Sequence, residues 1–409
     1  MNQATVQRHE AWRILQRLGA LAPEGEITLE PTGSGPLNGL TFAVKDLFDV
    51  AGYVTGCGNP DWKRTHKPAT RHAVSVERLL GAGARAIGKV ITDELAFSLN
   101  GQNFHYGTPR NSAAPDRIPG GSSAGSAAAV AGGACDLALG TDTGGSVRIP
   151  AALNGIYGIR PSHGVVDDRG VMPLARSHDT VGWFARSADI LAKVGDVLLP
   201  PDTGEDTPFS EVYLARDAWA LADPAVAAAL APYRDRIFAA IGPAIDMTLG
   251  ADCGGLTNWR MTFRFLQMRE IWAEHGAWIE AEKPRFGPEI AERFAMSKDA
   301  ASRTDTGEAE TRRLITSRLD DMLAEGGILV IPTAADIAPL KSMSAADSAG
   351  FRDRTLTLTC IAGLARLPQV TLPVAAVNGA PVGISLIARH GRDRALLALA
   401  KRLAQDLVS

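Results

Sequence analysis

Residues 119–150 are dominated by glycine, alanine and serine. The tract reads PGGSSAGSAAAVAGGACDLALGTDTGGSVRIP and contains eight glycines but no lysine and no histidine. Its first part, residues 120–135, predicts a helix of small residues, and DLALGTD predicts a strand that ends in a turn. The tract therefore concentrates accessible backbone and hydroxyl groups in one place, without a histidine that could activate them.

Strand and helix patterns alternate around this tract. LTFAV, AIGKVI, GIYGIR and GGILVIP read as short apolar strands, and residues 71–85 and 392–408 have helical periodicity. LPQVTLPVAAVNGAPVGISLIAR reads as two strands joined by an Asn378-Gly379 turn, a strong hairpin signal. The alternation predicts an α/β fold, either as one large domain or as two or three average domains, which 409 residues would allow.

Two polar segments interrupt the middle of the chain, at residues 198–211 and 302–310. Either could link two domains, but we favour surface loops within one domain. Between them, residues 259–280 predict a long helix with aromatic side chains on more than one face. Core packing is the ordinary explanation of these aromatic residues, and pocket lining is the alternative.

Composition and charge exclude several classes of partner. The chain is 45% hydrophobic and 21% charged, with a formal net charge of -3, as in a packed globular protein. No basic face indicates binding to nucleic acid or to an anionic membrane, so a small molecule is the expected partner. Residues 5–21 predict an amphipathic helix rather than a secretory signal, and no apolar run reaches the ~20 residues that span a bilayer. We therefore expect a cytoplasmic protein.

The four cysteines, Cys57, Cys135, Cys253 and Cys360, are scattered along the chain. They form no CxxC pair and no spacing with histidine that is typical of a zinc site. We expect buried free thiols, with neither disulfides nor a metal, and nothing in the sequence indicates a cofactor.

The run TDTGGSVR, residues 141–148, places Ser146 after two glycines at a predicted strand-to-helix turn. Glycine backbone at such a turn can direct consecutive N–H groups into one cavity, which is the geometry of an oxyanion hole. Ser146 would then be a nucleophile. An ordinary structural Gly-Gly turn explains the same residues equally well, so both interpretations stand on this motif alone.

Two further patterns are weaker on their own. GGSSAGS, residues 120–126, fits the G-x-S-x-G elbow of α/β-hydrolases with Ser123 in the reactive place, but that motif requires a preceding strand, and NSAAPDRIP does not predict one. A phosphate-binding P-loop is excluded because no Gly-Lys-Ser/Thr follows. Lys45, which ends the apolar run in FAVKD, would by itself be read as a solvated lysine at the end of a strand.

Taken together, Lys45 in AVKD, Ser122 in GGSSAGS and Ser146 in GTDTGGSVRIPA resemble the Ser-Ser-Lys triad of the amidase signature family, with the two serines 24 residues apart. The resemblance covers roughly residues 36–190 and 326–405. Within the family, VTGCGNPDW, HYGTPRN and SHDTVGWFAR are similar to the plant-type indole-3-acetamide amidohydrolases and their bacterial relatives.

The resemblance implies one amidase signature domain over residues 1–409, with a large mixed, twisted β-sheet sandwiched between helices. Residues 36–190 would form the signature core, and residues 190–326 a variable segment that builds the pocket. Residues 326–405 would supply the last core strands and a helix. A homodimer is compatible with the sequence but is not specified by it.

The family mechanism implies a role for each part of the motif. Ser146 would attack the amide carbonyl, and Ser122, in a cis peptide, would relay its proton to Lys45. Lys45 can act as the base only if burial lowers its pKa by roughly 2 to 3 from the usual value near 10.4. The oxyanion would be held by backbone N–H groups of Thr143, Gly144, Gly145 and Ser146. Residues expected to support this centre are Ser123, Asp142 and Arg148, and those expected to begin the substrate pocket are Phe97, Asn103 and Tyr106.

The expected function is hydrolysis of the C–N bond of a small amide, of an aryl-acetyl type such as indole-3-acetamide, to a carboxylate and ammonia. Two alternatives stay open: a GatA-like protein that generates ammonia for a partner amidotransferase, and a non-catalytic amidase-like interaction protein. The presence of Lys45, Ser122 and Ser146 argues against the second, because such relatives have lost triad members. The natural amide is left open, because a few pocket side chains decide acyl specificity.

Overall fold

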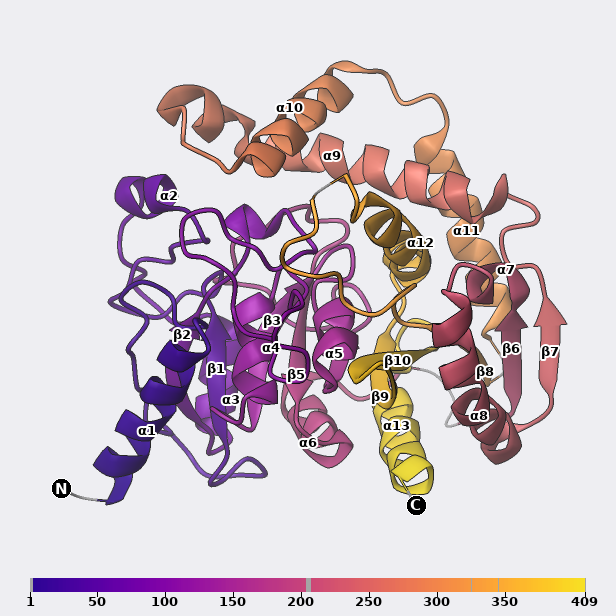
Figure 1. Cartoon of the computed structure of the whole chain (residues 1–409), viewed down its shortest axis with the longest axis horizontal. Coiled ribbons are helices and arrows are strands. Elements are labelled where there is room, and N and C mark those ends of the chain that lie inside the picture. The colour runs from indigo at the N-terminus through magenta and orange to yellow at the C-terminus, as the bar shows by residue number, and fades with distance from the viewer. Residues whose placement is uncertain (1–2, 204–206, 325, 345, 409) are drawn as a thin grey trace.

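Figure 1 shows the computed structural model of the chain, which describes residues 3–203, 207–324, 326–344 and 346–408. Within these residues the strands form one ten-stranded sheet. The strands are β1 (Thr41–Lys45), β2 (Arg85–Val90), β3 (Leu137–Asp142), β4 (Tyr157–Arg160), β5 (Thr180–Ala185), β6 (Glu211–Ala215), β7 (Ala244–Met247), β8 (Gly327–Pro332), β9 (Gln369–Val377) and β10 (Ala380–Ile387). Their order across the sheet is β2-β1-β3-β5-β4-β9-β10-β8-β6-β7, so strands from the start, the middle and the end of the chain share one sheet.

The sheet is parallel at its two ends and antiparallel in its middle. β1 pairs in parallel with β2 and β3, and β6 pairs in parallel with β7 and β8. The pairs that lead from β3 through β5, β4, β9 and β10 to β8 are antiparallel. This mixed sheet agrees with the α/β fold class that the sequence predicts.

Helices cover both faces of the sheet. Phe42 and Val44 of β1 belong to one buried cluster and Ala43 belongs to another, because side chains alternate between the two faces along a strand. On the Phe42 face the cluster includes α3 (Val74–Gly81), α6 (Ala188–Leu198) and α13 (Asp393–Val408). On the Ala43 face it includes α1 (Gln3–Arg17), α4 (Ala124–Ala131) and α5 (Arg148–Asn154). The expected α/β/α sandwich is therefore confirmed.

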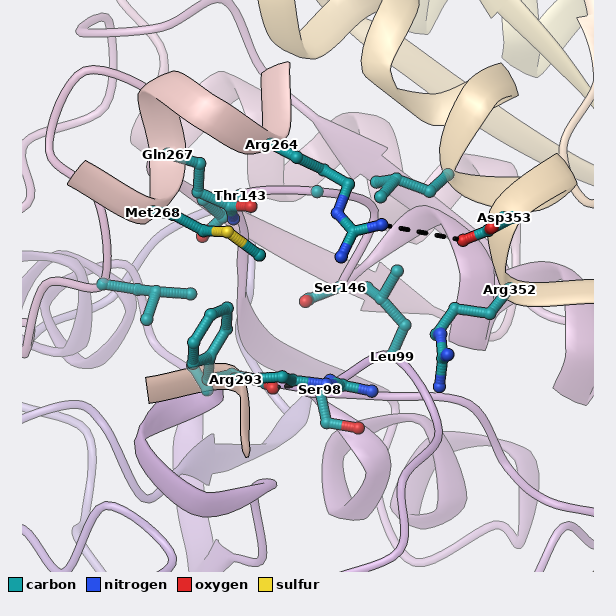
Figure 2. A pocket seen from close by; sticks show the side chains of 15 residues that line it. Ser98, Leu99, Thr143, Ser146, Arg264, Gln267, Met268, Arg293, Arg352 and Asp353 are labelled. Carbon is teal, nitrogen blue, oxygen red and sulfur yellow. Dashed lines mark hydrogen bonds and ion pairs between the residues drawn. The ribbon is translucent and has the colours of Figure 1, made fainter. Parts of the chain in front are cut away.

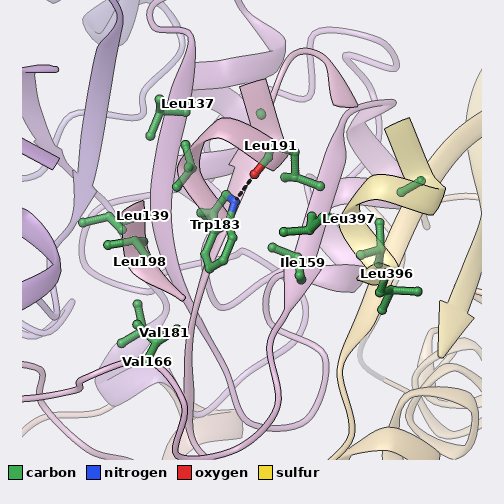
Figure 3. Packing of buried hydrophobic residues seen from close by; sticks show 14 of the residues in the cluster. Leu137, Leu139, Ile159, Val166, Val181, Trp183, Leu191, Leu198, Leu396 and Leu397 are labelled. Carbon is green, nitrogen blue, oxygen red and sulfur yellow. Dashed lines mark hydrogen bonds between the residues drawn. The ribbon is translucent and has the colours of Figure 1, made fainter. Parts of the chain in front are cut away.

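Trp183 of β5 lies within the core on the Phe42 face. Figure 3 shows its ring packed among Leu137 and Leu139 of the neighbouring strand and Leu198 of α6. Its indole N–H donates a 3.0 Å hydrogen bond to the carbonyl of Leu191. The polar end of the ring is thus satisfied, so the whole side chain can be buried at little cost.

A second helical layer lies over one end of the sheet. α9 (Gly255–Glu282) and α10 (Pro288–Ser302) run across the top of Figure 1, above α12 (Ala349–Ala365). Trp259 and Phe263 of α9 are buried in one cluster with α12 and with α11 (Glu308–Met322). The long helix predicted at residues 259–280 is therefore confirmed, and core packing explains these two aromatic residues. The remaining helices are α2 (Pro60–Thr65), η1 (Glu94–Ala96), α7 (Arg216–Trp219) and α8 (Pro224–Ile241).

The Asn378-Gly379 turn joins β9 to β10, as predicted. Both residues have positive φ angles, 50° and 78°, which a two-residue turn of the Asn-Gly type requires. The polar segment at 198–211 connects α6 to β6, with residues 204–206 outside the described ones. The segment at 302–310 differs from the expected loop at both ends, because α10 extends to Ser302 and α11 already begins at Glu308.

All four cysteines are free thiols. Three of them are buried as expected, but Cys253 is only partly buried, because it lies in the connection before α9. No helix in the described part of the chain is long and apolar enough to cross a membrane. Among the same residues, no group of three or more His, Cys, Asp or Glu side chains is arranged to hold a metal ion.

Candidate active site

Lys45 ends β1 and is completely buried, with 0% of its surface exposed. Its Nζ lies 2.8 Å from Ser122 Oγ, 2.9 Å from Ser123 Oγ and 2.8 Å from Thr141 Oγ1. Since β1 and β3 are adjacent and parallel, their carboxyl ends bring Lys45 and Thr141 to the same edge of the sheet. The predicted position at a strand end is confirmed, whereas the solvated lysine considered as an alternative is wrong.

Ser122 and Ser123 immediately precede α4. The Gly121–Ser122 peptide is cis, as the family resemblance implies. Ser123 Oγ also donates to the Thr141 carbonyl oxygen at 3.2 Å, which ties the start of α4 to the end of β3. No strand lies between β2 and β3, a stretch that the structure describes throughout, so the hydrolase elbow stays excluded.

Burial lowers the pKa of Lys45 from 10.5 to about 7, because the charged amine loses its hydration. The buried carboxyl groups of Asp93, Asp142 and Asp179 act in the opposite direction, but desolvation prevails. The direction and the cause agree with the expectation from the sequence. Near pH 7 a substantial fraction of Lys45 is therefore neutral and able to accept a proton.

The three hydroxyl groups around Lys45 suit a neutral amine. A neutral primary amine has two N–H donors and one lone pair, so two of the hydroxyl oxygens can accept from it while the third donates. Ser123 and Thr141 can take the two accepting positions. Ser122 can then share its proton with the lone pair across 2.8 Å, which is the contact that a proton relay needs.

Ser146 lies at the turn between β3 and α5. The turn requires glycine at position 145, because Gly145 has a φ of 130° and an added Cβ would lie 2.6 Å from Ile149 Cδ1. Figure 2 shows the Ser146 hydroxyl directed into a cavity. The Ser123 N–H donates to the Ser146 carbonyl over 3.4 Å, which keeps the two serine segments together. Within the described residues, Ser122 Oγ is in hydrogen-bond contact with Lys45 Nζ and forms no hydrogen bond with the Ser146 hydroxyl.

The Asp142 carboxylate fixes this turn. Its Oδ1 accepts from the Gly145 N–H at 3.0 Å and from Arg148 Nη2 at 2.6 Å. Its Oδ2 accepts from the Val147 N–H at 3.0 Å and from Arg148 Nε at 2.9 Å. Arg160 adds a contact of 3.2 Å to Oδ1, and the three charged side chains have 0% exposure. The expected support of the turn by Asp142 and Arg148 is therefore present as direct hydrogen bonds.

The contact with Asp142 corrects one of the four expected oxyanion donors. The Gly145 N–H already donates to the carboxylate, so it is not available to a substrate. Thr143, Gly144 and Ser146 line the cavity, whereas Gly145 is not among its lining residues. The oxyanion assignment is therefore restricted to these three N–H groups.

Replacing Asp142 by asparagine is expected to lower the free energy of unfolding by about 3–5 kcal/mol, because two buried guanidinium groups lose their counter-charge. Burial alone would raise the pKa of Asp142, but Arg148 and Arg160 hold it well below its usual range, so the carboxylate is charged in the folded protein. Urea denaturation at neutral pH measures the loss.

The matched control is Asp167→Asn. Asp167 pairs with Arg169, whose side chain is 77% exposed, so its loss should cost less than about 1 kcal/mol. Similar losses in the two variants would contradict a structural role for the buried Asp142 network.

The cavity above Ser146 opens between the end of the sheet and the second helical layer. The space between its atoms, counted to the open mouth and so including solvent, is about 600 Å³. Phe97 lines it, as predicted. Gln267 and Met268 of α9 also line it, so the pocket-lining alternative for this helix holds for part of its surface.

Asn103 and Tyr106, which were expected to begin the pocket, are not among the residues that line this cavity. The Asn103 Nδ2 group donates to the carbonyl oxygens of Gly58 at 2.8 Å and Thr92 at 3.0 Å. Its Oδ1 accepts from the N–H groups of His105 at 2.8 Å and Tyr106 at 2.9 Å. The expectation is corrected, because the Asn103 side chain is fully used in fixing a buried loop.

Two sets of site residues have no counterpart among the sequence-based expectations. Thr141 contacts Lys45, and its place at the end of a strand beside the lysine strand was a usable signal. The arginines of the cavity wall, Arg264, Arg293 and Arg352, carry no such signal, because isolated arginines on predicted helices look like ordinary surface charges.

The profile of the Amidase family matches residues 6–223 and 270–397. The chain belongs to the amidase signature family. This amidase is 41% identical over 411 residues to "Amidase 1" of Arabidopsis thaliana, over 93% of this chain and 96% of the relative. It is 30% identical over 429 residues to a glutamyl-tRNA(Gln) amidotransferase component of Halobacterium salinarum, over 93% and 98%. A solved structure described as "Crystal structure of amidase" superimposes with a TM-score of 0.82 at 28% identity, over 98% of this chain and 94% of that one.

Residues 224–269 of this amidase lie outside the family match and comprise α8, β7 and the first part of α9. They include Arg264, Gln267 and Met268 of the cavity wall. Part of the pocket is therefore built by a segment that the family profile does not describe, within the stretch expected to build the pocket.

Proposed function

We propose that this amidase hydrolyses the C–N bond of a small primary amide through a triad of Ser146, cis-Ser122 and Lys45. The observation that carries the proposal is the buried Lys45 amine, 2.8 Å from the Ser122 hydroxyl, beside a cavity that Ser146 lines. A lysine whose pKa lies near 7 can serve as the base that a histidine supplies in other serine hydrolases.

In the first half-reaction, Lys45 takes the proton of the Ser122 hydroxyl while Ser122 takes the proton of Ser146. Ser146 Oγ bonds to the amide carbon, and the carbonyl oxygen becomes an oxyanion. The backbone N–H groups of Thr143, Gly144 and Ser146 would stabilise that charge. The contact between the two serine hydroxyls is expected to close with substrate bound, because catalytic hydrogen bonds are often long in the free enzyme.

Breakdown of the first tetrahedral intermediate reverses the proton path. Protonated Lys45 returns a proton through Ser122 to the amide nitrogen, the C–N bond breaks, and ammonia leaves. Water then gives a proton to the same relay and attacks the acyl ester on Ser146. The carboxylate product leaves, and the Ser146 hydroxyl is restored.

The pH dependence of kcat/KM is expected to show an acid limb with an apparent pKa of about 7, set by the buried amine of Lys45. Below that pH the amine holds its proton, so the rate should fall by up to about tenfold per pH unit. Initial rates between about pH 5 and about pH 9 test this expectation, with folding monitored in parallel by circular dichroism. A flat profile in the folded protein would refute Lys45 as the base.

An aryl-acetyl amide, of which indole-3-acetamide is the example, is the finer proposal for the substrate. It is supported by the apolar part of the cavity. The side chains of that part are Phe97, Leu99, Leu174, Met268 and Leu356. An aromatic ring would bury its face against them.

The test is ammonia release by the purified chain from indole-3-acetamide, phenylacetamide and short aliphatic amides. Absence of ammonia with every amide would reject the proposal.

The amidotransferase alternative is favoured by one observation, the 30% identity to the Halobacterium salinarum protein. A protein of that type would need companion chains, whereas the proposed amidase should release ammonia from free amides when alone. A non-catalytic interaction protein would release none and would form no acyl-enzyme.

Three expectations stay predictions of the sequence: a cytoplasmic location, the lack of nucleic-acid or membrane partners, and a homodimer.

A further inference from the structure

Three guanidinium groups line the cavity that holds Ser146. Arg264 comes from α9, Arg293 from α10 and Arg352 from α12. Figure 2 shows their side chains around the space that the Ser146 hydroxyl enters. Their side chains are 30%, 16% and 27% exposed, respectively, so the charges are largely withdrawn from solvent. Three cations in a partly buried cavity need negative charge nearby.

Asp353 supplies part of that charge. It lines the cavity and lies 3.1 Å from Arg260 and 4.0 Å from Arg264. Its side chain is 43% exposed, so water screens its charge more than it screens the arginines. Because Arg260 makes the closer contact, Asp353 leaves Arg264 poorly compensated.

Glu289 of α10 pairs with the other two arginines, at 3.3 Å from Arg293 and 3.7 Å from Arg352. Asp93 is a third carboxyl group near Arg293, but burial raises its pKa to about 6, and its Oδ2 already accepts from the Gly101 N–H. Even with Asp93 ionised, this region holds fewer negative than positive side chains. The three carboxylates belong to Asp93, Glu289 and Asp353, and the four guanidinium groups to Arg260, Arg264, Arg293 and Arg352.

The guanidinium groups of Arg264 and Arg352 retain free hydrogen-bond donors. Among the described residues their carboxylate contacts are 4.0 Å and 3.7 Å long, beyond the range of a good hydrogen bond. Arg293 differs, because its Nη1 donates to the Phe97 carbonyl oxygen at 2.7 Å. Burial and the neighbouring arginines lower the pKa of Arg264, and they lower that of Arg293 to about 10, so the groups repel one another. An anion between them would relieve the repulsion.

We propose that the preferred substrate carries a carboxylate on its acyl portion, bound by Arg264 and Arg352. This inference rests on the proposed function: the leaving group there is ammonia, so a charge on the substrate must belong to the acyl portion. The apolar residues of the same cavity hold the carbon chain or ring between the two ends. Neutral aryl-acetyl amides are then poorer substrates of the same site.

Two matched pairs of primary amides test the charge preference. They are phenylacetamide with para-carboxyphenylacetamide, and butyramide with the monoamide of succinic acid. We expect kcat/KM of the charged member to exceed that of the neutral one by about 10- to 100-fold in at least one pair, as charge-assisted hydrogen bonds allow. Equal or lower kcat/KM for the charged member in both pairs would overturn the inference, while hydrolysis of the neutral amides would leave the proposed function standing.

Arginine variants test which side chains cause the preference for a charged amide. Arg352→Gln should reduce kcat/KM for the preferred charged amide by about 10- to 100-fold more than it reduces kcat/KM for the neutral partner. Arg264→Gln should act in the same way. Arg313→Gln is the control, because Arg313 is 66% exposed and pairs with Glu310 on α11. An equal loss on both members of a pair would contradict binding of the carboxylate by these arginines.

Binding separates this inference from the catalytic proposal. Calorimetric titration of the Ser146→Ala variant with para-carboxyphenylacetamide and with phenylacetamide compares their affinities without turnover. Tighter binding of the charged amide supports the inference even if no amide is hydrolysed by the wild type. Equal binding of the two amides overturns it even if hydrolysis is fast.

Discussion

The Ser146→Ala variant is expected to lose hydrolysis of every amide substrate, with kcat reduced at least about 10⁴-fold. Ser146 lines the cavity, and its hydroxyl points into the space that a carbonyl carbon would occupy (Figure 2). The substitution deletes the atom that forms the acyl-enzyme and leaves Lys45 and Ser122 in place. Ammonia release measures the rate. Intact-protein mass after mixing with phenyl acetate should show an acyl adduct on the wild type and none on the variant.

Ser126→Ala is the control for this experiment. Ser126 belongs to α4 in the same small-residue tract, and its buried hydroxyl donates to the Leu139 carbonyl oxygen at 2.8 Å. We expect this variant to keep its activity and to lose about 1 kcal/mol of stability. An active, folded Ser146→Ala variant would reject the assigned nucleophile.

The Lys45→Met variant is expected to lower kcat/KM about 10³- to 10⁴-fold, the range found when a general base is removed. Methionine fills much of the same space but cannot accept a proton. The proton that Ser146 passes to Ser122 then has no base to receive it. The residual rate should also lack the acid limb near pH 7. Lys193→Met is the control, because Lys193 is a 46% exposed lysine paired with Asp189 on α6. If the Lys45→Met variant kept the acid limb of its pH profile, that limb would belong to another titrating group.

The same substitution predicts a pH-dependent difference in stability. Because the folded pKa of Lys45 is about 7 and the ordinary value is 10.5, the unfolded chain binds one more proton than the folded chain between these values. The wild type should therefore gain stability relative to Lys45→Met as the pH rises through this window, by up to about 1.4 kcal/mol per pH unit. Below pH 7 the difference should be constant. A difference that is constant throughout would show that the amine is not held neutral by burial.

The places of Ser146 and Lys45 in the fold could be predicted because their requirements are local, whereas the roles of these residues were inferred from the resemblance to the amidase signature family. Ser146 follows two glycines in a strand-to-helix turn, and Gly145 has the positive φ angle that such a turn demands. Lys45 ends an apolar run, and this pattern correctly predicts its position at a strand end. Its burial could not be derived from that run alone, because burial depends on the chain around Ser122 and Thr141 closing over it.

Other parts of the fold gave weaker signals. β5 is buried at every position, so its residues lack the alternation that marks a strand. β7 is a four-residue edge strand whose side chains are mostly exposed, and such short strands have little pattern to read. Asn103 was expected in the pocket, whereas its amide is used by loop backbone. The arginines of the cavity wall escaped prediction because α9, α10 and α12 meet only in the folded chain.

The reactive atoms and the arginines of the cavity wall come from different stretches of the chain. Lys45, Ser122 and Ser146 all precede α5, whereas the arginine-bearing helices α9, α10 and α12 all follow β7 (Figure 1). Arg264 and Arg293 lie on consecutive helices, α9 and α10, so a new acyl preference could be installed by exchanging these two helices together between related enzymes. The chemistry would be inherited unchanged, and only the range of accepted molecules would differ.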